Sequence, residues 1–306
     1  MPGVVRPRTG ALLELIAEDA ELERLAAGFR FTEGPVWHPR ERHLLFSDMP
    51  GDVRRRWSAD RGVEEVRRPA DKCNGMAYDA DGNLIVCEHS TSRVVRERPD
   101  GTVEVLAGHY RGRELNSPND VLVAPDGSIY FTDPVYGRMP GFGVPREPEL
   151  PFRGLYRLAG GSAGEPELLV AEDEFEQPNG LCLSPDGSLL YVNDTPRALI
   201  RVYEVAGDGR LRAGRPFATG IGDGDTSKGA PDGMKCDAGG NVWVTGPGGI
   251  WVFGSDGAQL GTVQIPEVVG NLAWGGEGWR ELFVAASTSI YRLRTRVPGR
   301  LPAFAA

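Results

Sequence analysis

Short runs of alternating apolar and polar residues, separated by turns rich in Asp and Gly, recur along most of the chain. Alternation over about four to eight positions is typical of half-buried β-strands. Asp-Gly and Gly-Gly pairs favour hairpin turns, because both residue types tolerate the positive φ that these turns require. Helical periodicity is confined to a short stretch near residues 11–17. The pattern therefore predicts an all-β protein.

One unit recurs six times, and it consists of a polar anchor residue, a short apolar strand, a tight turn and a second β-rich run. The six anchors are Glu33, Asn74, Asn119, Asn179, Asp232 and Asn271. Successive anchors are about forty to sixty residues apart, which is the length of a four-stranded propeller blade with variable loops. We therefore predict a six-bladed β-propeller with four antiparallel strands per blade, occupying residues 1–306 as a single domain.

The last repeat is short of one strand. After Asn271 the pattern indicates only three strands, at residues 272–274, 281–285 and 290–293. A strand-like segment at residues 22–27 precedes the first anchor. We expect this segment to complete the last blade, because a ring closed in this way leaves no exposed strand edge.

Composition and charge exclude several classes of partner. The 306 residues have a net charge of -9 and 40% hydrophobic residues, and no basic stripe with interleaved aromatics is present. Nucleic acid is therefore not expected as a partner. No apolar stretch is long enough to span a membrane, and the first residues do not resemble a secretory signal. The four cysteines are widely spaced, so we expect free thiols and a cytoplasmic protein of unassigned oligomeric state.

The anchors carry the main chemical prediction. In a propeller the innermost strand of every blade lines the central channel, so equivalent positions converge there. Six carbonyl or carboxylate side chains would be costly to bury without a partner, and a hard cation with oxygen ligands satisfies them together. Any single anchor could instead serve as a turn former, since Asn, Asp and Gly dominate turns. Glu33 fits that alternative least, and the recurrence at one position favours a metal such as calcium.

Loop lengths support a pocket over the anchors. The turns that follow the first strand of each unit are uniformly short. The connections on the opposite face are long, at residues 109–118, 133–151, 172–178 and 220–231. Long loops that cluster on one face are typical of a functional site. We therefore expect the binding pocket at the anchor end of the channel.

The anchors and their flanks resemble the gluconolactonase / senescence marker protein / luciferin-regenerating enzyme family. The resemblance covers about residues 23–293 and rests on an ordered set of motifs. These motifs are residues 31–37 (FTEGPVW), 87–89 (CEH), 115–120 (LNSPND), 131–134 (FTDP), 177–180 (QPNG) and 231–234 (PDGM). The family implies a six-bladed propeller that hydrolyses a sugar lactone such as gluconolactone with one catalytic divalent ion.

The resemblance also implies a set of site residues. The metal ligands of the family correspond to Glu33, Asn179 and Asp232, and its substrate-contacting Asn corresponds to Asn119, which is also a candidate ligand. Animal members carry a substrate-binding Arg where this chain has Ser117. The chain is therefore closer to bacterial gluconolactonase-like members. Among the remaining anchors, Asn271 is a further candidate metal ligand.

These residues suggest a mechanism in which the cation polarises the lactone carbonyl and a water attacks it. The resemblance implies Asp232 as the general base. A metal-bound carboxylate is a weak base, so Asp133 or His89 could share that role or contact substrate. Tyr136, in the long connection at residues 133–151, is a candidate substrate contact, and with Phe142 it could form a lid. The ion is expected to be Ca2+, with Zn2+, Mg2+ and Mn2+ as alternatives.

Other functions receive less support. Residues 160–164 (GGSAG) match the serine nucleophile motif G-x-S-x-G, but no His follows His109, so a Ser–acid–His order cannot be completed. No phosphate-binding G-x-x-x-x-G-K-[ST] loop is present. Two alternatives stay open, a promiscuous metal-dependent esterase or phosphotriesterase on the same scaffold and a non-catalytic ligand-binding propeller.

Overall fold

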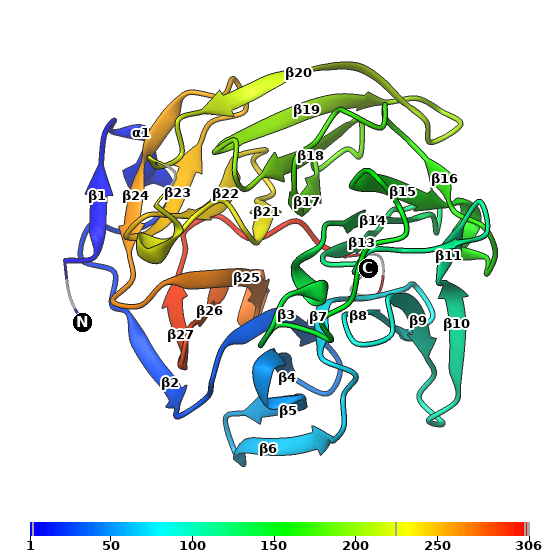
Figure 1. Ribbon diagram of the computed structural model, residues 1–306. Coiled ribbons are helices and arrows are strands. Elements are labelled where there is room, and N and C mark those ends of the chain that lie inside the picture. The colour runs from blue at the N-terminus through cyan, green and yellow to red at the C-terminus, as the bar shows by residue number, and fades with distance from the viewer. Residues whose placement is uncertain (2, 224, 303, 305–306) are drawn as a thin grey trace.

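The computed structural model describes residues 1, 3–223, 225–302 and 304. It confirms the predicted all-β, six-bladed propeller, whose antiparallel sheets surround a central channel (Figure 1). Blade 1 consists of β3 (Thr32–His38), β4 (His43–Asp48), β5 (Val53–Ser58) and β6 (Gly62–Arg67). Blade 2 consists of β7 (Cys73–Tyr78), β8 (Leu84–Glu88), β9 (Arg93–Glu97) and β10 (Val103–Ala107). Blade 3 consists of β13 (Val121–Val123), β14 (Ile129–Asp133), β15 (Gly154–Leu158) and β16 (Glu167–Leu168).

The second half of the ring repeats this arrangement. Blade 4 consists of β17 (Pro178–Leu183), β18 (Leu189–Asp194), β19 (Leu199–Val205) and β20 (Leu211–Thr219). Blade 5 contains β21 (Met234–Cys236), β22 (Val242–Gly246), β23 (Gly249–Phe253) and β24 (Gln259–Gln264). Blade 6 contains β25 (Val269–Gly275), β26 (Glu281–Ala286) and β27 (Ser289–Arg294). A small hairpin of β11 (His109–Tyr110) and β12 (Arg113–Glu114) and five 3-10 turns (Met49–Gly51, Tyr136–Arg138, Ala159–Gly161, Thr226–Lys228 and Glu277–Trp279) lie in the connections.

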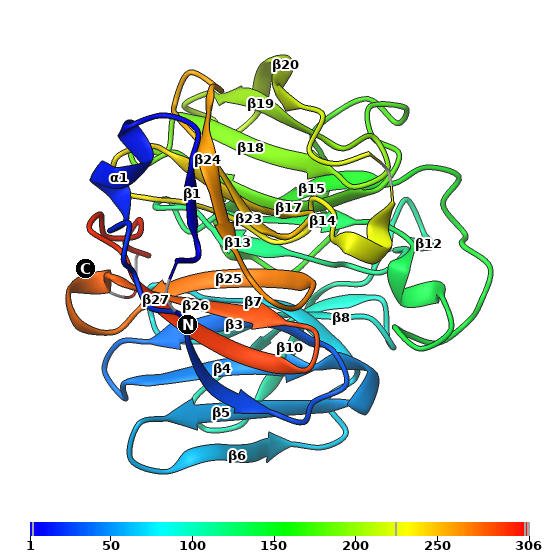
Figure 2. The ribbon, with the colours of Figure 1, turned by 90° about the vertical axis from the view of Figure 1, so that its left-hand side faces the viewer.

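The N-terminal segment closes the ring as expected. Strand β2 (Glu23–Ala27) pairs antiparallel with β27 and supplies the missing outer strand of blade 6. An unpredicted strand, β1 (Val5–Pro7), adds a fifth strand to blade 5 by pairing with β24. The short helix α1 (Ala11–Leu15) follows β1, and both lie beside β24 (Figure 2). Among the described residues, no helix is long and apolar enough to cross a membrane.

Aspartate side chains shape the turns that follow the inner strands. In blade 2, Asp79 Oδ1 accepts the backbone N–H of Asn83 at 2.9 Å, and Gly82 takes the positive φ of 83° that the turn requires. In blade 5, Asp237 Oδ1 accepts the backbone N–H of Asn241 at 2.9 Å in the same way. The repeated Asp therefore fixes a tight turn at one end of each of these inner strands, which leaves the opposite end for long connections.

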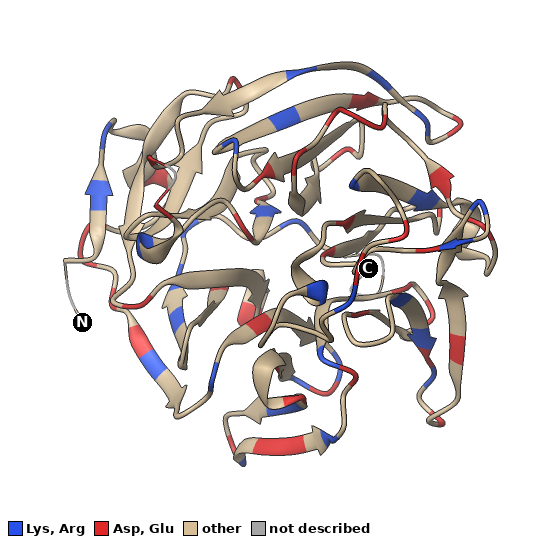
Figure 3. Ribbon diagram, viewed as in Figure 1, with Lys and Arg blue, Asp and Glu red and all other residues tan. Residues whose placement is uncertain are grey.

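The core lies between blades. The buried apolar side chains of the described residues form six clusters, and each one joins residues of two neighbouring blades. Charged residues lie mainly on the outer strands and connections, whereas the inner strands are largely uncharged (Figure 3). Because each cluster belongs to two blades, burial of apolar surface holds the ring together and fixes the positions of the inner strands.

Glycines let adjacent inner strands approach closely at the anchors. A β-carbon on Gly34, which has a φ of 51°, would overlap the carbonyl oxygen of Asn74 in the next blade. A β-carbon on Gly180 would likewise overlap the carbonyl oxygen of Asp232. Glycine directly after these two anchors is therefore a packing requirement, because it lets neighbouring inner strands approach closely.

Candidate metal and substrate site in the central channel

The anchors lie at one mouth of the channel, at the start of the inner strands. Glu33, Asn74, Asn179 and Asn271 belong to β3, β7, β17 and β25, while Asn119 and Asp232 directly precede β13 and β21. Five of these side chains are buried and Asp232 retains partial exposure. Convergence is direct at two anchors, since Asn271 Nδ2 donates to Glu33 Oε2 at 3.1 Å.

Two anchor carboxyl groups have raised pKa values. Burial raises the pKa of Glu33 to about 7, and the neighbouring negative charge of Asp120 contributes to the rise. Burial also raises the pKa of Asp232 well above its ordinary value, and the charges of Glu33 and Asp120 add to this effect. Both shifts mean that negative charge is costly at this mouth, so a bound cation would favour the ionised carboxylates.

Asn179 offers an oxygen toward the same region. Its Nδ2 donates to Thr195 Oγ1 at 3.1 Å, and Thr195 Oγ1 in turn donates to the carbonyl oxygen of Pro231 at 2.7 Å. The Oδ1 atom of Asn179 is buried and has no hydrogen-bond donor among the described residues. A buried amide oxygen without a donor carries a desolvation cost that a cation can remove. Together with Glu33 and Asp232, it forms an oxygen donor set of the kind preferred by hard cations.

His89 lies beside the channel with both ring nitrogens engaged. Its Nδ1 is 3.0 Å from the carbonyl oxygen of Phe142, which can only accept, so Nδ1 carries the proton. The other nitrogen, Nε2, therefore accepts from Asn74 Nδ2 at 3.2 Å. Burial lowers the pKa of His89 to about 4. The ring is therefore neutral near pH 7 and orients the side chain of Asn74.

Asp133 supports the backbone next to Asn119. Its carboxylate accepts the backbone N–H groups of Asn116 at 2.9 Å and Ser117 at 2.8 Å, and the residue is fully buried. Burial raises its pKa to about 7, although these two hydrogen bonds act in the opposite direction. Asp133 therefore holds in place the backbone of Asn116 and Ser117, which precedes Asn119.

The long connection between β14 and β15 folds over this region. Tyr136 is half-buried; burial raises the pKa of its phenol, and the neighbouring charge of Asp232 adds to the rise. Gly137 packs so closely on His89 that a β-carbon would clash with the imidazole. The ring of Phe142 packs edge-on against Phe31, with centroids 5.7 Å apart. The connection thus brings a phenol toward Asp232 and covers His89.

A second cluster of potential metal-ligating side chains lies where β3 ends and β4 begins. Ligand atoms of His38, Glu41 and His43 fall within 4.8 Å of one another. However, His38 Nδ1 accepts the backbone N–H of Glu41 at 3.0 Å, so Nε2 carries the proton in neutral His38 and has no free lone pair. Metal binding here would require that hydrogen bond to break. The two imidazole rings instead stack with centroids 5.0 Å apart.

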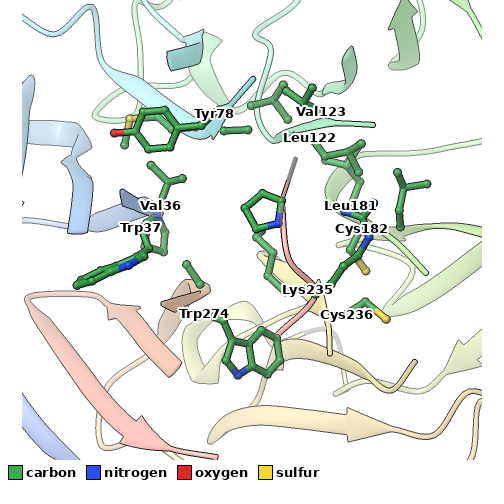
Figure 4. A pocket seen from close by; sticks show the side chains of 18 of the residues that line it. Val36, Trp37, Tyr78, Leu122, Val123, Leu181, Cys182, Lys235, Cys236 and Trp274 are labelled. Carbon is green, nitrogen blue, oxygen red and sulfur yellow. The ribbon is translucent and has the colours of Figure 1, made fainter. Parts of the chain in front are cut away.

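The other mouth of the channel is apolar. It contains a cavity of about 140 Å³, lined by side chains that include Val36, Met76, Leu122, Leu181, Lys235 and Trp274 (Figure 4). The C-terminal segment crosses this cavity, where Arg300 donates its backbone N–H to the carbonyl oxygen of Cys236 at 3.2 Å. None of the six anchors lines this cavity.

Comparison with known proteins identifies the family of this chain. Residues 31–288 match the family described as the SMP-30/Gluconolactonase/LRE-like region. The chain belongs to this family. One relative is the gluconolactonase of Zymomonas mobilis, which is 32% identical over 96% of this chain and 85% of that protein. The pentonolactonase XacC of Haloferax volcanii is 28% identical over 84% of this chain and 82% of that protein.

Two solved structures superpose on most of the chain. A gluconolactonase from Xanthomonas campestris has a TM-score of 0.86 at 34% identity, covering 96% of this chain and 97% of that one. The calcium-binding protein regucalcin of Agrobacterium tumefaciens has a TM-score of 0.75 at 19% identity, covering 94% of this chain and 98% of that one. At that identity the second likeness concerns the fold alone.

Two charged residues of the channel were not predicted from the sequence. Asp120 and Lys235 each follow an anchor closely, and Lys235 Nζ lies 3.5 Å from Asp120 Oδ2. A signal for Asp120 was present, because four other anchors are followed by glycine. Lys235 had no comparable signal, since a lysine in a short strand is usually a solvent-exposed residue.

Proposed function

We propose that this protein is a lactonase that opens a sugar lactone to the aldonic acid with the help of one divalent cation. The observation that supports this most is the convergence of Glu33, Asp232 and the donorless oxygen of Asn179 at one mouth of the channel. The family relatives include a gluconolactonase and a pentonolactonase, which supports a lactone of a sugar acid as substrate.

The proposed ligands of the cation are Glu33, Asn179 and Asp232, with Asn119 as a further candidate. Asn271 acts on Glu33 in this proposal, because its Nδ2 donates to Oε2 and its Oδ1 accepts the backbone N–H of Leu272 at 2.9 Å. When bound, the cation supplies Lewis acidity that polarises the lactone carbonyl. Calcium is the proposed ion because it accepts about six to eight oxygen ligands in flexible geometry, and Zn2+, Mg2+ and Mn2+ are alternatives.

Asp232 is the proposed general base, which removes a proton from the attacking water. It is the anchor carboxyl group that retains partial exposure, and so water can reach it. His89 is less suited to this role, because its Nε2 already accepts from Asn74 and its lowered pKa makes it a weak base.

On the substrate side, we assign hydrogen bonding to the lactone hydroxyls to Asn119 and Tyr136. The phenol of Tyr136 is close enough to Asp232 for its charge to raise the phenol pKa, so both groups could contact one small substrate. His89 and Asp133 act through their neighbours in this proposal. His89 orients Asn74, and Asp133 holds the backbone that precedes Asn119.

The experiment that tests the function is acid release from a panel of aldonolactones, with the metal content measured by elemental analysis. We expect hydrolysis that stops after chelation and returns when Ca2+ is added. No acid above the spontaneous rate with any lactone, with the metal restored, would refute the enzyme assignment. Hydrolysis of paraoxon without hydrolysis of any lactone would instead identify a phosphotriesterase on this scaffold.

The cysteines support a reducing compartment. All four, Cys73, Cys87, Cys182 and Cys236, are buried and unpaired. Free thiols persist where glutathione and thioredoxin keep them reduced. We therefore propose the cytoplasm as the location of this protein, and detection of the four thiols in protein isolated from that fraction tests it.

A further inference from the structure

The ammonium group of Lys235 lies among three oxygen atoms inside the channel. Its Nζ is 3.0 Å from the carbonyl oxygen of Met234, 3.3 Å from Asn271 Oδ1 and 3.5 Å from Asp120 Oδ2. The lysine stem lines the apolar cavity of the opposite mouth (Figure 4). Lys235 therefore separates the two halves of the channel and has its charge on the polar side.

Asp120 occupies a position that is glycine in four of the other five repeats. Four anchors are followed directly by a glycine, namely Gly34, Gly75, Gly180 and Gly233. In blade 3 the residue after Asn119 is Asp120, and its side chain is only 4% exposed. Its Oδ1 accepts the backbone N–H of Val121 at 2.9 Å, while its Oδ2 has no hydrogen-bond donor among the described residues. The Oδ2 atom depends on the ammonium group of Lys235 for compensation of its charge.

Charge balance explains why a lysine is present. The fully ionised channel contains three carboxylates, Glu33, Asp232 and Asp120, and one ammonium group, so one divalent cation makes it neutral. Without the ammonium group, one divalent cation would leave a buried carboxylate without a counter-charge. Leaving a buried charge uncompensated is strongly destabilising.

We infer that Asp120, Asn271 and the carbonyl group of Met234 form a second cation site, which the ammonium group of Lys235 fills. This inference rests on the proposed metal site and adds to it a reason for a single divalent ion. A carboxylate, an amide oxygen and a backbone carbonyl are ligands that calcium and other hard cations use. Removal of the ammonium group therefore opens the second site to a soluble cation.

The two sites are coupled through one side chain. Asn271 Oδ1 contacts Lys235, and Asn271 Nδ2 donates to Glu33 Oε2 at 3.1 Å. The ammonium group thus keeps the amide in the orientation that supports Glu33. Lys235 is a positioning residue for the first site as well as the occupant of the second.

The test is the stoichiometry of calcium binding, measured by calorimetry and elemental analysis on chelator-treated protein. We expect one Ca2+ per chain for the wild type and two for Lys235→Met, which keeps an apolar stem and removes the charge. The matched control is Lys228→Met, because Lys228 is an exposed lysine paired with Asp225 and its loss changes the net charge equally. We expect one ion for this control.

A double variant, Asp120→Asn with Lys235→Met, removes both charges and should bind one ion again. One ion in Lys235→Met, with an affinity within threefold of the wild type, would overturn the inference. Two ions in the double variant would overturn the role of Asp120. If Lys235→Met folds only when cation is added, the inference is supported. If Lys235→Met does not fold with any added cation while the double variant folds, the inference is wrong.

These outcomes are separate from the proposed function. A wild type that binds no divalent ion would refute the first site and, with it, the lactonase mechanism. In that case, one additional ion in Lys235→Met relative to the wild type could still be measured. Activity is not needed for either readout.

Discussion

The two mouths of the channel are built from the same inner strands but have opposite chemistry. Strand β3 places Glu33 at one mouth and Trp37 at the other, and β7 does the same with Asn74 and Tyr78. Four residues of strand separate the members of each pair, or about 13 Å at about 3.3 Å per residue. The polar mouth collects carboxyl groups whose ionisation is costly, whereas the apolar mouth is crossed by the C-terminal segment.

The two mouths differ in loop length as well as in chemistry. Short Asp-rich turns end the strands at the apolar mouth, and long connections meet at the polar mouth. Loops can vary without disturbing the blade contacts, so binding and catalytic groups are expected where the loops are long. Changes at the polar mouth should therefore affect activity, and changes at the apolar mouth should affect stability.

The largest effect is expected from Asp232→Asn, which removes the proposed base and a proposed ligand. We expect kcat/KM for an aldonolactone to fall by about 10²–10⁴-fold, the range typical of a general base. Steady-state kinetics on the metal-loaded protein measures this. The control is Asp256→Asn, because Asp256 is an exposed carboxylate in the turn between β23 and β24. Equal activity in Asp232→Asn and wild type would contradict the assignment.

Removal of the metal should make stability depend on pH at the polar mouth. Burial raises the pKa of Glu33 from 4.5 to about 7 in the folded chain. The folded state then binds the proton more tightly than the unfolded state, so this contribution to stability is complete below about pH 4.5 and is lost as pH rises through about 7. Asp133 has a shift in the same direction, from 3.8 to about 7.

Calcium should therefore raise the melting temperature of chelator-treated protein more at pH 8 than at pH 5. Thermal unfolding with and without Ca2+ at both pH values measures the difference. In Glu33→Gln, which has no titrating group at this position, the difference between the two pH values should shrink. A calcium effect of equal size at both pH values in the wild type would contradict the cause that we assign to the shift.

A smaller effect is expected from Tyr136→Phe, which removes one hydroxyl group near Asp232. One hydrogen bond to substrate is worth about 0.5–1.5 kcal/mol, so we expect kcat/KM to fall by about 2- to 13-fold. Tyr130→Phe serves as the control, because the Tyr130 hydroxyl group donates to the carbonyl oxygen of Gly209 at 2.9 Å in a blade-to-blade contact. If both variants lose activity equally, Tyr136 has no special role in substrate binding.

The smallest effect on activity is expected from Phe304→Ala at the apolar mouth. Phe304 is 5% exposed, and its ring lies near Tyr78 and His38, with centroid distances of 5.3 and 5.1 Å. We expect a loss of about 3–5 kcal/mol in the free energy of unfolding and a kcat/KM within twofold of the wild type. Denaturant unfolding and kinetics measure the two quantities. A large loss of activity would show that the two mouths are coupled.

Much of the fold could be predicted because the blade repeat is local. The three strands after Asn271 and the closing role of residues 22–27 depend on alternation and turn residues within a few positions, and the structure confirms them. Strand β1 was missed, since three residues without a flanking turn signal carry little pattern. The anchors occupy equivalent positions in the repeat, so the sequence predicted that they lie at the same end of the channel.

The partners of individual side chains could not be predicted in the same way. The sequence offered His89 as a candidate base, but Asn74 engages its Nε2, and a carbonyl group 53 residues away engages its Nδ1. The protonation of the ring depends on those contacts. A pattern along the chain contains the residue types but not the direction in which each side chain points.

The propeller, its six anchors and the mouth at which they meet follow from the amino-acid sequence, because repeats and turns act over short distances along the chain. The contact of Lys235 with Asp120 between the two halves of the channel arises only in the folded protein. Their contact joins blades 3 and 5, and it exists because ring closure brings strands from distant parts of the chain to one axis. The charge balance of the channel is therefore a property of the folded ring.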